Sequence, residues 1–330
     1  MAVSDKKTSR YISAFDAVAR GDLKELMRIV PVMVNLKYNE KCPVEDSPFY
    51  RCSLLHAAAV HGSPEIVTYL ISRGLKTSLK NGMGQTPMHC AISMRKKNIC
   101  EILQILLAAP GAGVNARDFD GDSLLHYAVC RDIKIVEFLV KNKAKTDVKN
   151  FWGETPLHTA AEKSDVPAIK YLLSHRAVID ERDSFGGTAL KSAICGKDPE
   201  KAVAVLLSAG ADPDSRDNDG NTPLHIAAMS GETGVVKLLI KAGADRSVTN
   251  NEGVTASHLC DGELSLLLVP PKRKPKKKMP KDLSVPSGTK AKSKTMENHT
   301  GRHTEQHNTK EERSNKKKRT LPAAKSFSER

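Results

Sequence analysis

The sequence is poor in aromatic residues and has no long apolar run. Aromatic side chains make up 4% of the 330 residues, with a single tryptophan, a share that fits helices packed through small residues better than a β-sandwich. No apolar stretch approaches the ~18 residues that a membrane-spanning helix needs. The first residues contain no apolar segment of the kind found in secretory signals. We therefore expect an intracellular protein without a transmembrane segment.

Cysteine pairs and catalytic signatures are also missing. The seven cysteines form no CxxC pair, and with no export signal they indicate reduced thiols and not a disulfide framework. There is no Walker loop, no GxSxG, no HExxH and no GxGxxG between a strand and a helix. No zinc-ligand spacing stands out. We expect no enzyme, no metal site and no cofactor.

Positive charge is present in excess but is confined to one end of the chain. The formal net charge is +14, and residues 270–330 carry 19 Lys/Arg against 6 Asp/Glu. The other 269 residues are nearly neutral at +1, which argues against a large nucleic-acid-binding face on the body. The basic segment has too few apolar residues to offset the entropy of ordering, so we expect it to be disordered.

What the sequence does have is a repeat. A string that reads SLLH, TPLH or a close variant ends at His56, His89, His126, His158, Lys191, His225 and His258. The intervals are 33, 37, 32, 33, 34 and 33 residues, and a glycine shortly before the string keeps the same period from Gly84 onwards. Self-similarity at such a period is typical of a solenoid of stacked units.

Each unit predicts two short helices and an extended finger. In residues 221–250, Thr222 can cap the first helix and Pro223 suits its first turn. Gly231 ends that helix, and a second, apolar helix follows and stops at Gly243. A unit of this size cannot bury its own apolar face, so neighbouring units must share one continuous core.

These features resemble the ankyrin-repeat family. The resemblance rests on the TPLH string, the glycine between the helices, the apolar second helix and the GAD turn, and it covers about residues 11–269. It implies an all-α ankyrin-repeat solenoid, with a helix-turn-helix and a β-hairpin or loop finger in each unit. We expect a disordered N-terminus at 1–10, units at about 11–51, 52–84, 85–121, 122–153, 154–186, 187–220 and 221–253, a partial cap at 254–269, and a disordered basic tail at 270–330.

The recurring histidines resemble a metal or catalytic set, but the family resemblance implies a structural role. They occupy the same position in successive units, one stack spacing apart. In the family this histidine makes a hydrogen bond near the start of the first helix. We therefore predict a structural role for them, and neither metal binding nor catalysis.

The resemblance also implies that partners bind along the fingers and the exposed side of the first helices. Three of the seven phenylalanines and the only tryptophan fall on fingers, and aromatic residues dominate binding hot spots. For any one of these aromatics, packing against the neighbouring finger is the alternative. We predict a protein-binding groove that contains Met83, Phe119, Phe151, Trp152, Phe185, Tyr127, Arg131 and Met229.

Two further features carry alternative interpretations. Asn115 lies where ankyrin proteins of this family can be hydroxylated on asparagine; the alternative is an unmodified residue that stabilises the turn. The basic cluster in the tail resembles a nuclear-import signal, although such clusters also fit nucleic-acid or anionic-lipid contacts, or a merely solubilising tail. The cluster consists of Lys272, Arg273, Lys274, Lys276, Lys277 and Lys278.

The function that we expect is a non-catalytic adaptor, scaffold or inhibitor in the nucleus, the cytoplasm or both. It would act as a monomer on a protein partner that the sequence does not identify, with importin as a further partner of the tail. One alternative is a nuclear regulator that resembles the ankyrin-type inhibitors of transcription factors. The other is polyanion binding through the tail, to nucleic acid or anionic lipid, which predicts a steep dependence on salt.

Overall fold

The computed structural model describes residues 12–30, 52–94, 98–129 and 131–269. All of them belong to one unit of the chain, Met1–Arg273. The segments 1–10 and 270–330, and with them the basic cluster of the tail, lie outside the described residues.

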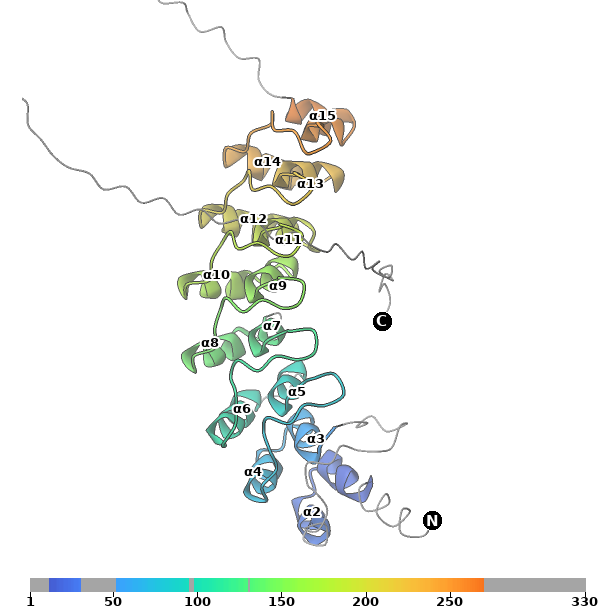
Figure 1. Ribbon diagram of the computed structural model, residues 1–330, viewed down its shortest axis with the longest axis vertical. Coiled ribbons are helices and arrows are strands. Elements are labelled where there is room, and N and C mark those ends of the chain that lie inside the picture. The colour runs from blue at the N-terminus through green and yellow to red at the C-terminus, as the bar shows by residue number, and fades with distance from the viewer. Residues whose placement is uncertain (1–11, 31–51, 95–97, 130, 270–330) are drawn as a thin grey trace, which may run out of the picture. The chain divides into compact units, whose positions relative to one another are not determined.

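Short helices come in pairs, as Figure 1 shows. Residues 12–20 are helical and precede α2 (Leu23–Ile29). The following pairs are α3 (Leu54–His61) and α4 (Pro64–Ser72), α5 (Pro87–Ser93) and α6 (Ile99–Ala108), α7 (Leu124–Ala128) and α8 (Ile133–Lys141), α9 (Pro156–Glu162) and α10 (Val166–Ser174), α11 (Ala189–Ile194) and α12 (Pro199–Ser208), and α13 (Pro223–Met229) and α14 (Thr233–Lys241). A 3₁₀ turn, η2 (Ala256–His258), and α15 (Gly262–Leu268) end the described chain.

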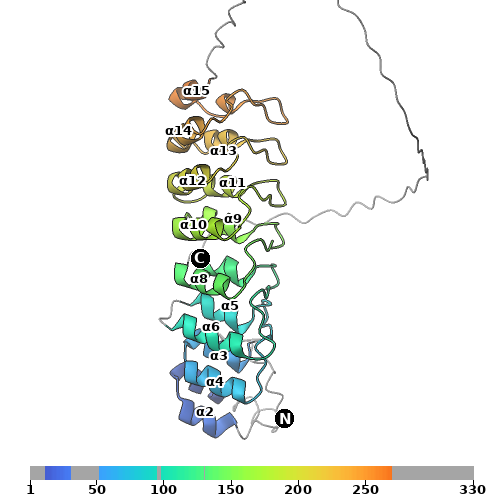
Figure 2. The same cartoon turned by 90° about the vertical axis from the view of Figure 1, so that its left-hand side faces the viewer.

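The pairs stack so that like helices meet. The first helix of each pair contacts the first helices of its neighbours, as in α3–α5 and α9–α11, and the second helices do the same, as in α10–α12 and α12–α14. For the pairs from α9 to α14, Figure 2 shows the second helices on one side of the first helices and the fingers on the other. Each finger therefore lies beside the finger of the next unit.

The expectation of an all-α solenoid is confirmed. In the part of the chain that the structure describes, β pairing is limited to two isolated bridges, Arg117–Ser123 and Thr249–Thr255. Both lie at the base of a finger. None of the helices in the described ranges is long and apolar enough to cross a membrane.

The core follows from the composition of the two helix types. First helices contribute alanines such as Ala160 and Ala161, which are fully buried and let neighbouring helices approach closely. Second helices contribute larger apolar side chains such as Ile169 and Leu172, also fully buried. Burial of one such side chain stabilises the fold by about 1.5–3 kcal/mol. Because this core runs through all the pairs, it holds the fingers in a regular row.

Candidate functional site

The recurring histidines link each unit to the next. In the unit of α9, the backbone N–H of Thr155 donates to Nδ1 of His158 at 3.1 Å, and the Thr155 hydroxyl lies 2.8 Å from the same nitrogen. Because Nδ1 accepts a backbone N–H, the ring proton sits on Nε2, which donates to the Gly187 carbonyl at 3.3 Å. The same contacts are made by His56, His89, His126 and His225.

These histidines are buried. Burial lowers the pKa of His89 and of His126 to about 4, and burial likewise lowers the pKa of His158. Both ring nitrogens of each residue are occupied by hydrogen bonds within the protein. The geometry therefore assigns them the structural role that the sequence predicts and leaves no free ring nitrogen for a metal.

Lys191 replaces this histidine in the unit of α11 and makes a different link. Its Nζ lies 2.7 Å from Oδ2 of Asp217, on the next finger, whose carboxylate is buried. Burial opposes ionisation of Asp217, but the Lys191 ammonium and the backbone N–H groups of Asn221 and Asp219 outweigh it, so the pKa of Asp217 is lowered. An ion pair thus links this unit to the next, as the histidine ring does in the other units.

Each finger between residues 81 and 253, the part of the chain in which the structure describes them, is closed by an Asn or Asp whose side chain caps its own turn. In the finger of the fourth unit, Oδ1 of Asn150 accepts from the backbone N–H groups of Trp152 and Glu154 at 3.0 and 2.9 Å. Asn81, Asp118, Asp183, Asp217 and Asn250 make the equivalent pair of hydrogen bonds. The two residues that follow the capping Asn or Asp form the tip of the finger. We call the first of them the leading tip residue and the second the trailing tip residue; in this finger they are Phe151 and Trp152.

The tips are joined into a ladder of backbone hydrogen bonds. From the finger of Phe119 to that of Asn251, the N–H of the leading tip residue donates to the carbonyl of the trailing tip residue one finger earlier, at 2.8–3.1 Å. The donors are Phe119, Phe151, Ser184, Asn218 and Asn251, and the acceptors are Met83, Asp120, Trp152, Phe185 and Asp219. The ladder fixes the row of tips before any partner arrives.

Five of the predicted binding residues lie together in this row and are exposed. The exposed fraction is 63% for Met83, 57% for Phe119, 70% for Phe151, 47% for Trp152 and 62% for Phe185. The backbones contact the neighbouring fingers, while the side chains remain largely open to solvent. Each of the two leading phenylalanines has a cation beside its ring, since Lys80 Nζ lies 5.8 Å from the centre of the Phe119 ring and the Arg117 guanidinium 5.8 Å from that of Phe151.

The other three predicted binding residues are placed differently. Tyr127 is partly buried, and its hydroxyl donates to Oδ2 of Asp118 at 2.7 Å and accepts from Nε2 of Gln85 at 2.8 Å. Burial and the Asp118 carboxylate raise its pKa, and the residue braces two fingers. Arg131 and Met229 are exposed at the carboxyl ends of first helices, outside the row of tips.

Asn115 links the turns of adjacent units. Its Oδ1 accepts from the backbone N–H of Lys145 at 2.8 Å, and its Nδ2 donates to the Lys143 carbonyl at 3.4 Å. This arrangement supports the turn-stabilising alternative, and hydroxylation of Asn115 stays a prediction.

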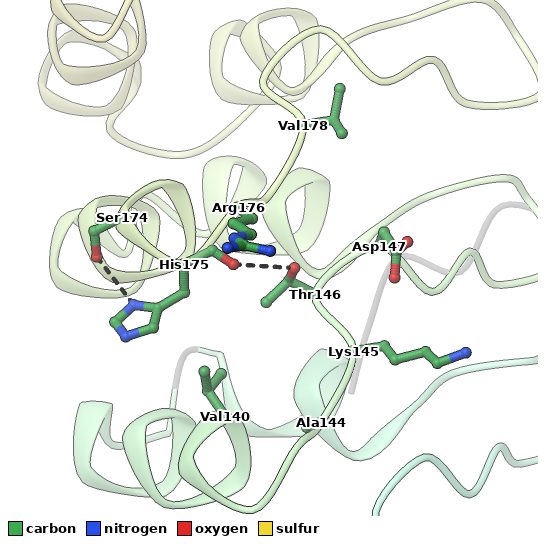
Figure 3. Close-up of a pocket in the computed structure, with 9 residues that line it drawn as sticks. All are labelled: Val140, Ala144, Lys145, Thr146, Asp147, Ser174, His175, Arg176 and Val178. Carbon is green, nitrogen blue, oxygen red and sulfur yellow. Dashed lines mark hydrogen bonds between the residues drawn. The ribbon is translucent and has the colours of Figure 1, made fainter.

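A hollow of about 400 Å³ lies between the turns that follow α8 and α10 (Figure 3). Its wall contains Val140, Lys145, Thr146, Asp147, Ser174, His175 and Arg176, among others. The Thr146 hydroxyl donates to the His175 carbonyl at 3.5 Å, and in Figure 3 the Lys145 side chain extends away from Arg176. Charges of both signs line an open surface here, and no ligand class is favoured.

No metal site emerges among the residues that the structure describes: no group of three or more His, Cys, Asp or Glu side chains could hold an ion.

The sequence did not predict two features of the row of tips, namely the backbone ladder and the Tyr127 brace. The sequence signal for the ladder is the Asn or Asp at a fixed position before each finger glycine.

Comparison with known proteins matches the repeats. A family model described as ankyrin repeats (3 copies) matches residues 15–118, 55–150, 125–217 and 196–269. The chain is 32% identical over 192 residues to the nuclear factor NF-kappa-B p105 subunit of Gallus gallus, covering 55% of this chain and 19% of that protein. It is 27% identical over 177 residues to the B-cell lymphoma 3 protein homolog of Mus musculus, covering 52% and 39%.

Solved structures agree with the fold. The ankyrin repeat domain of Bcl-3, described as a unique member of the IkappaB protein family, has a TM-score of 0.58 at 27% identity and covers 69% of this chain and 97% of that one. The human ASB11 ankyrin repeat domain has a TM-score of 0.57 at 26% identity and covers 68% and 99%. The chain thus spans nearly all of these isolated domains but less than half of the two curated relatives.

Proposed function

The chain belongs to the ankyrin-repeat family, and on that premise we propose that it is a non-catalytic module that binds a partner protein along its row of finger tips. The observation that carries the proposal is the run of four exposed aromatic side chains on three successive fingers: Phe119, Phe151, Trp152 and Phe185. An aromatic side chain buries about 150–250 Å² when it is covered. Four of them on neighbouring tips offer a partner a large apolar contact.

Rigidity of the tips supports the same proposal. The turn-capping side chains and the ladder hold the aromatic residues in place, so little backbone ordering is left to oppose binding. A preorganised surface binds more tightly than a flexible one of the same area because less entropy is lost. A non-catalytic role is also favoured. The recurring histidines are the residues best suited to acid–base chemistry, and both of their ring nitrogens are engaged in structural hydrogen bonds.

A second candidate is a nuclear regulator, within the same binding mode. Two of the relatives bear on it: one is named as a nuclear factor and one solved structure is described as a member of the IkappaB protein family. The basic cluster Lys272–Lys278 supplies a candidate nuclear address. Neutralising this cluster in the full chain and following its localisation tests the candidate; an unchanged distribution would contradict it.

Affinity purification with a tip variant tests the main proposal. Phe119→Ala, Trp152→Ala and Phe185→Ala are combined in the full chain. We expect the proteins captured by the wild-type chain to be lost or reduced at least tenfold, since hot-spot aromatics each contribute about 2 kcal/mol or more. Circular dichroism establishes that the variant is folded.

A matched control removes exposed apolar side chains that lie outside the fingers: Val178→Ala, Leu266→Ala and Val269→Ala, all about half exposed or more. This variant is expected to keep the same partners. Capture of the same partners by a folded tip variant would overturn the proposal, and partners that remain only while the tail is present would point instead to polyanion or import contacts.

A further inference from the structure

The row of tips changes chemistry along the stack. The trailing tip residues Met83, Trp152 and Phe185 are large and apolar, whereas the last two, Asp219 and Glu252, are acidic and exposed. The remaining one, Asp120, shares its finger with the exposed ring of Phe119. An apolar stretch over the fingers of the second to fifth units is therefore followed by an acidic stretch over the next two.

The two carboxylates of the acidic stretch are available for a partner. No ion pair with Asp219 or Glu252 occurs in the described ranges of the chain, and their backbones are held by the turn-capping bonds to Asp217 and Asn250. The nearest basic side chain in sequence, Arg216, is engaged elsewhere, because its guanidinium donates to the Thr249 carbonyl at 2.8 Å.

The neighbouring amides are not available in the same way. The leading tip residues Asn218 and Asn251 use their side chains to reach back one finger, where they donate to the carbonyls of Ser184 and Asn218 at 3.1 and 3.0 Å. The carboxylates are thus the charged groups that these two tips offer to a partner, while the Nδ2 groups of the amides are engaged within the protein.

Charge around the acidic stretch reinforces the contrast. Residues 187–269 hold 11 Asp/Glu against 7 Lys/Arg, a net of −4. At the other end of the row, Lys80 and Arg117 lie over the rings of Phe119 and Phe151. A charged partner segment therefore meets a different potential at each end of the row.

From these observations, and resting on the proposed function, we propose that the row binds one segment of a partner protein in a fixed direction. Apolar side chains of that segment cover the aromatic tips, and Lys or Arg side chains meet Asp219 and Glu252. Complementary charges of this kind set the register of a complex and disfavour wrong partners, more than they raise affinity.

The stack also sets the spacing within the segment. Packed helices lie about 8–10 Å apart, so successive tips are separated by roughly that distance. An extended chain advances about 3.3 Å per residue. The basic side chain that meets Asp219 should then lie about three residues from the apolar side chain that covers Phe185, and the one that meets Glu252 about six residues from it.

A peptide library tests the proposal without knowledge of the natural partner. Phage-displayed random 12-residue peptides are selected on the full chain, and selected peptides are synthesised with a fluorescent label. Their Kd is measured by fluorescence polarisation at low and high salt. We expect selected peptides to carry aromatic or aliphatic residues followed or preceded, at about three and six residues, by Lys or Arg.

Charge variants of the protein then identify the contact. Asp219→Asn with Glu252→Gln should weaken binding of these peptides by roughly twofold to thirtyfold, the range of two exposed ion pairs, and the loss should shrink at high salt. Asp219→Lys with Glu252→Lys should weaken it further and should favour peptides in which Lys is replaced by Glu. The control Glu65→Lys with Glu101→Lys, on second helices away from the fingers, should change nothing.

The outcomes separate this inference from the function on which it rests. Selected peptides that lose binding in the Trp152→Ala, Phe185→Ala variant but ignore the charge variants would overturn the directional proposal and leave the binding function standing. Selected peptides that ignore both sets of variants would overturn both. Equal effects of the control pair and the Asp219/Glu252 pair would mean that only net charge matters, which also contradicts the proposal.

Discussion

His89 is a base that the fold keeps neutral. Its Nδ1 accepts from the N-cap backbone and its Nε2 donates to the next unit, so protonation removes an acceptor that a buried donor needs. The pKa of His89 and of His126 is about 4 in the folded protein, against about 6.5 in an unfolded chain. The unfolded state therefore binds more protons between these values.

Stability should consequently fall as the pH falls from about 6.5 toward 4 and stay flat above 6.5. The limiting loss is about 3 kcal/mol for each of the two histidines. Urea unfolding at pH 7.5, 6.5, 5.5 and 4.5 measures it. Constant stability over this range would contradict the assignment of buried, neutral imidazoles.

The pair Lys191 and Asp217 offers a second test at the same scale. Lys191→Met leaves a buried carboxylate without its cation, which should cost about 2 kcal/mol or more. The double variant with Asp217→Asn should recover much of that loss, because it removes the charge as well. Chemical denaturation of the wild type, both single variants and the double variant gives the coupling; additive effects would contradict a direct ion pair.

At the scale of the finger, the ladder depends on close approach at the glycine that ends each finger. Gly153 has φ +77°, and a Cβ there would meet the Ser184 nitrogen at 2.6 Å. Gly253 has the same φ, but a Cβ there would meet nothing within 4 Å. The two positions share the cost of a left-handed backbone and differ only in the neighbouring finger.

Alanine at the two glycines should therefore have unequal effects. Gly253→Ala should cost about 1–2 kcal/mol, the left-handed strain alone. Gly153→Ala should cost at least about 1 kcal/mol more, since overpacking adds to the strain, and it should weaken partner binding by displacing the tip that bears Phe185. Thermal unfolding of both variants measures the difference in their stability. Equal losses of stability would show that the ladder does not contribute to it.

The helix pairs could be predicted from the sequence because their signals are local. Caps such as Thr222, the proline after it and the apolar second helix all lie within one unit. The exposed aromatic residues of the fingers could also be predicted, from the same repeat period. The sequence did not predict the ladder, the Tyr127 brace or the Lys191 ion pair. These contacts join atoms in different units, as far as 42 residues apart for Gln85 and Tyr127.

At the scale of the whole repeat body, the extensive contacts of each described pair of helices are with the pairs next to it. Stability then adds up from unit to unit, and the ends can unfold before the middle. The only tryptophan, Trp152, reports on the fourth unit, whereas circular dichroism reports on all the helices. The two signals can therefore separate local from global unfolding.

A buried leucine in the last helix tests this view. Leu268→Ala, at a fully buried position of α15, should cost about 2–5 kcal/mol and shift the first part of the dichroism transition in urea to lower concentration. The Trp152 fluorescence midpoint should move less. Leu157→Ala, in the first helix of the unit after Trp152, should move both signals, and identical shifts for the two variants would indicate a single cooperative body.

The ladder of tips also allows the row to be lengthened by whole units. Each rung uses only backbone atoms of adjacent fingers, so a duplicated unit would join the row without new side chains. Such a unit between Phe185 and Asp219 would move the acidic tips one spacing further from the aromatic ones and leave both unchanged. Copying a unit would thereby alter the length of partner segment that fits, which gives gene duplication a direct route to new specificity.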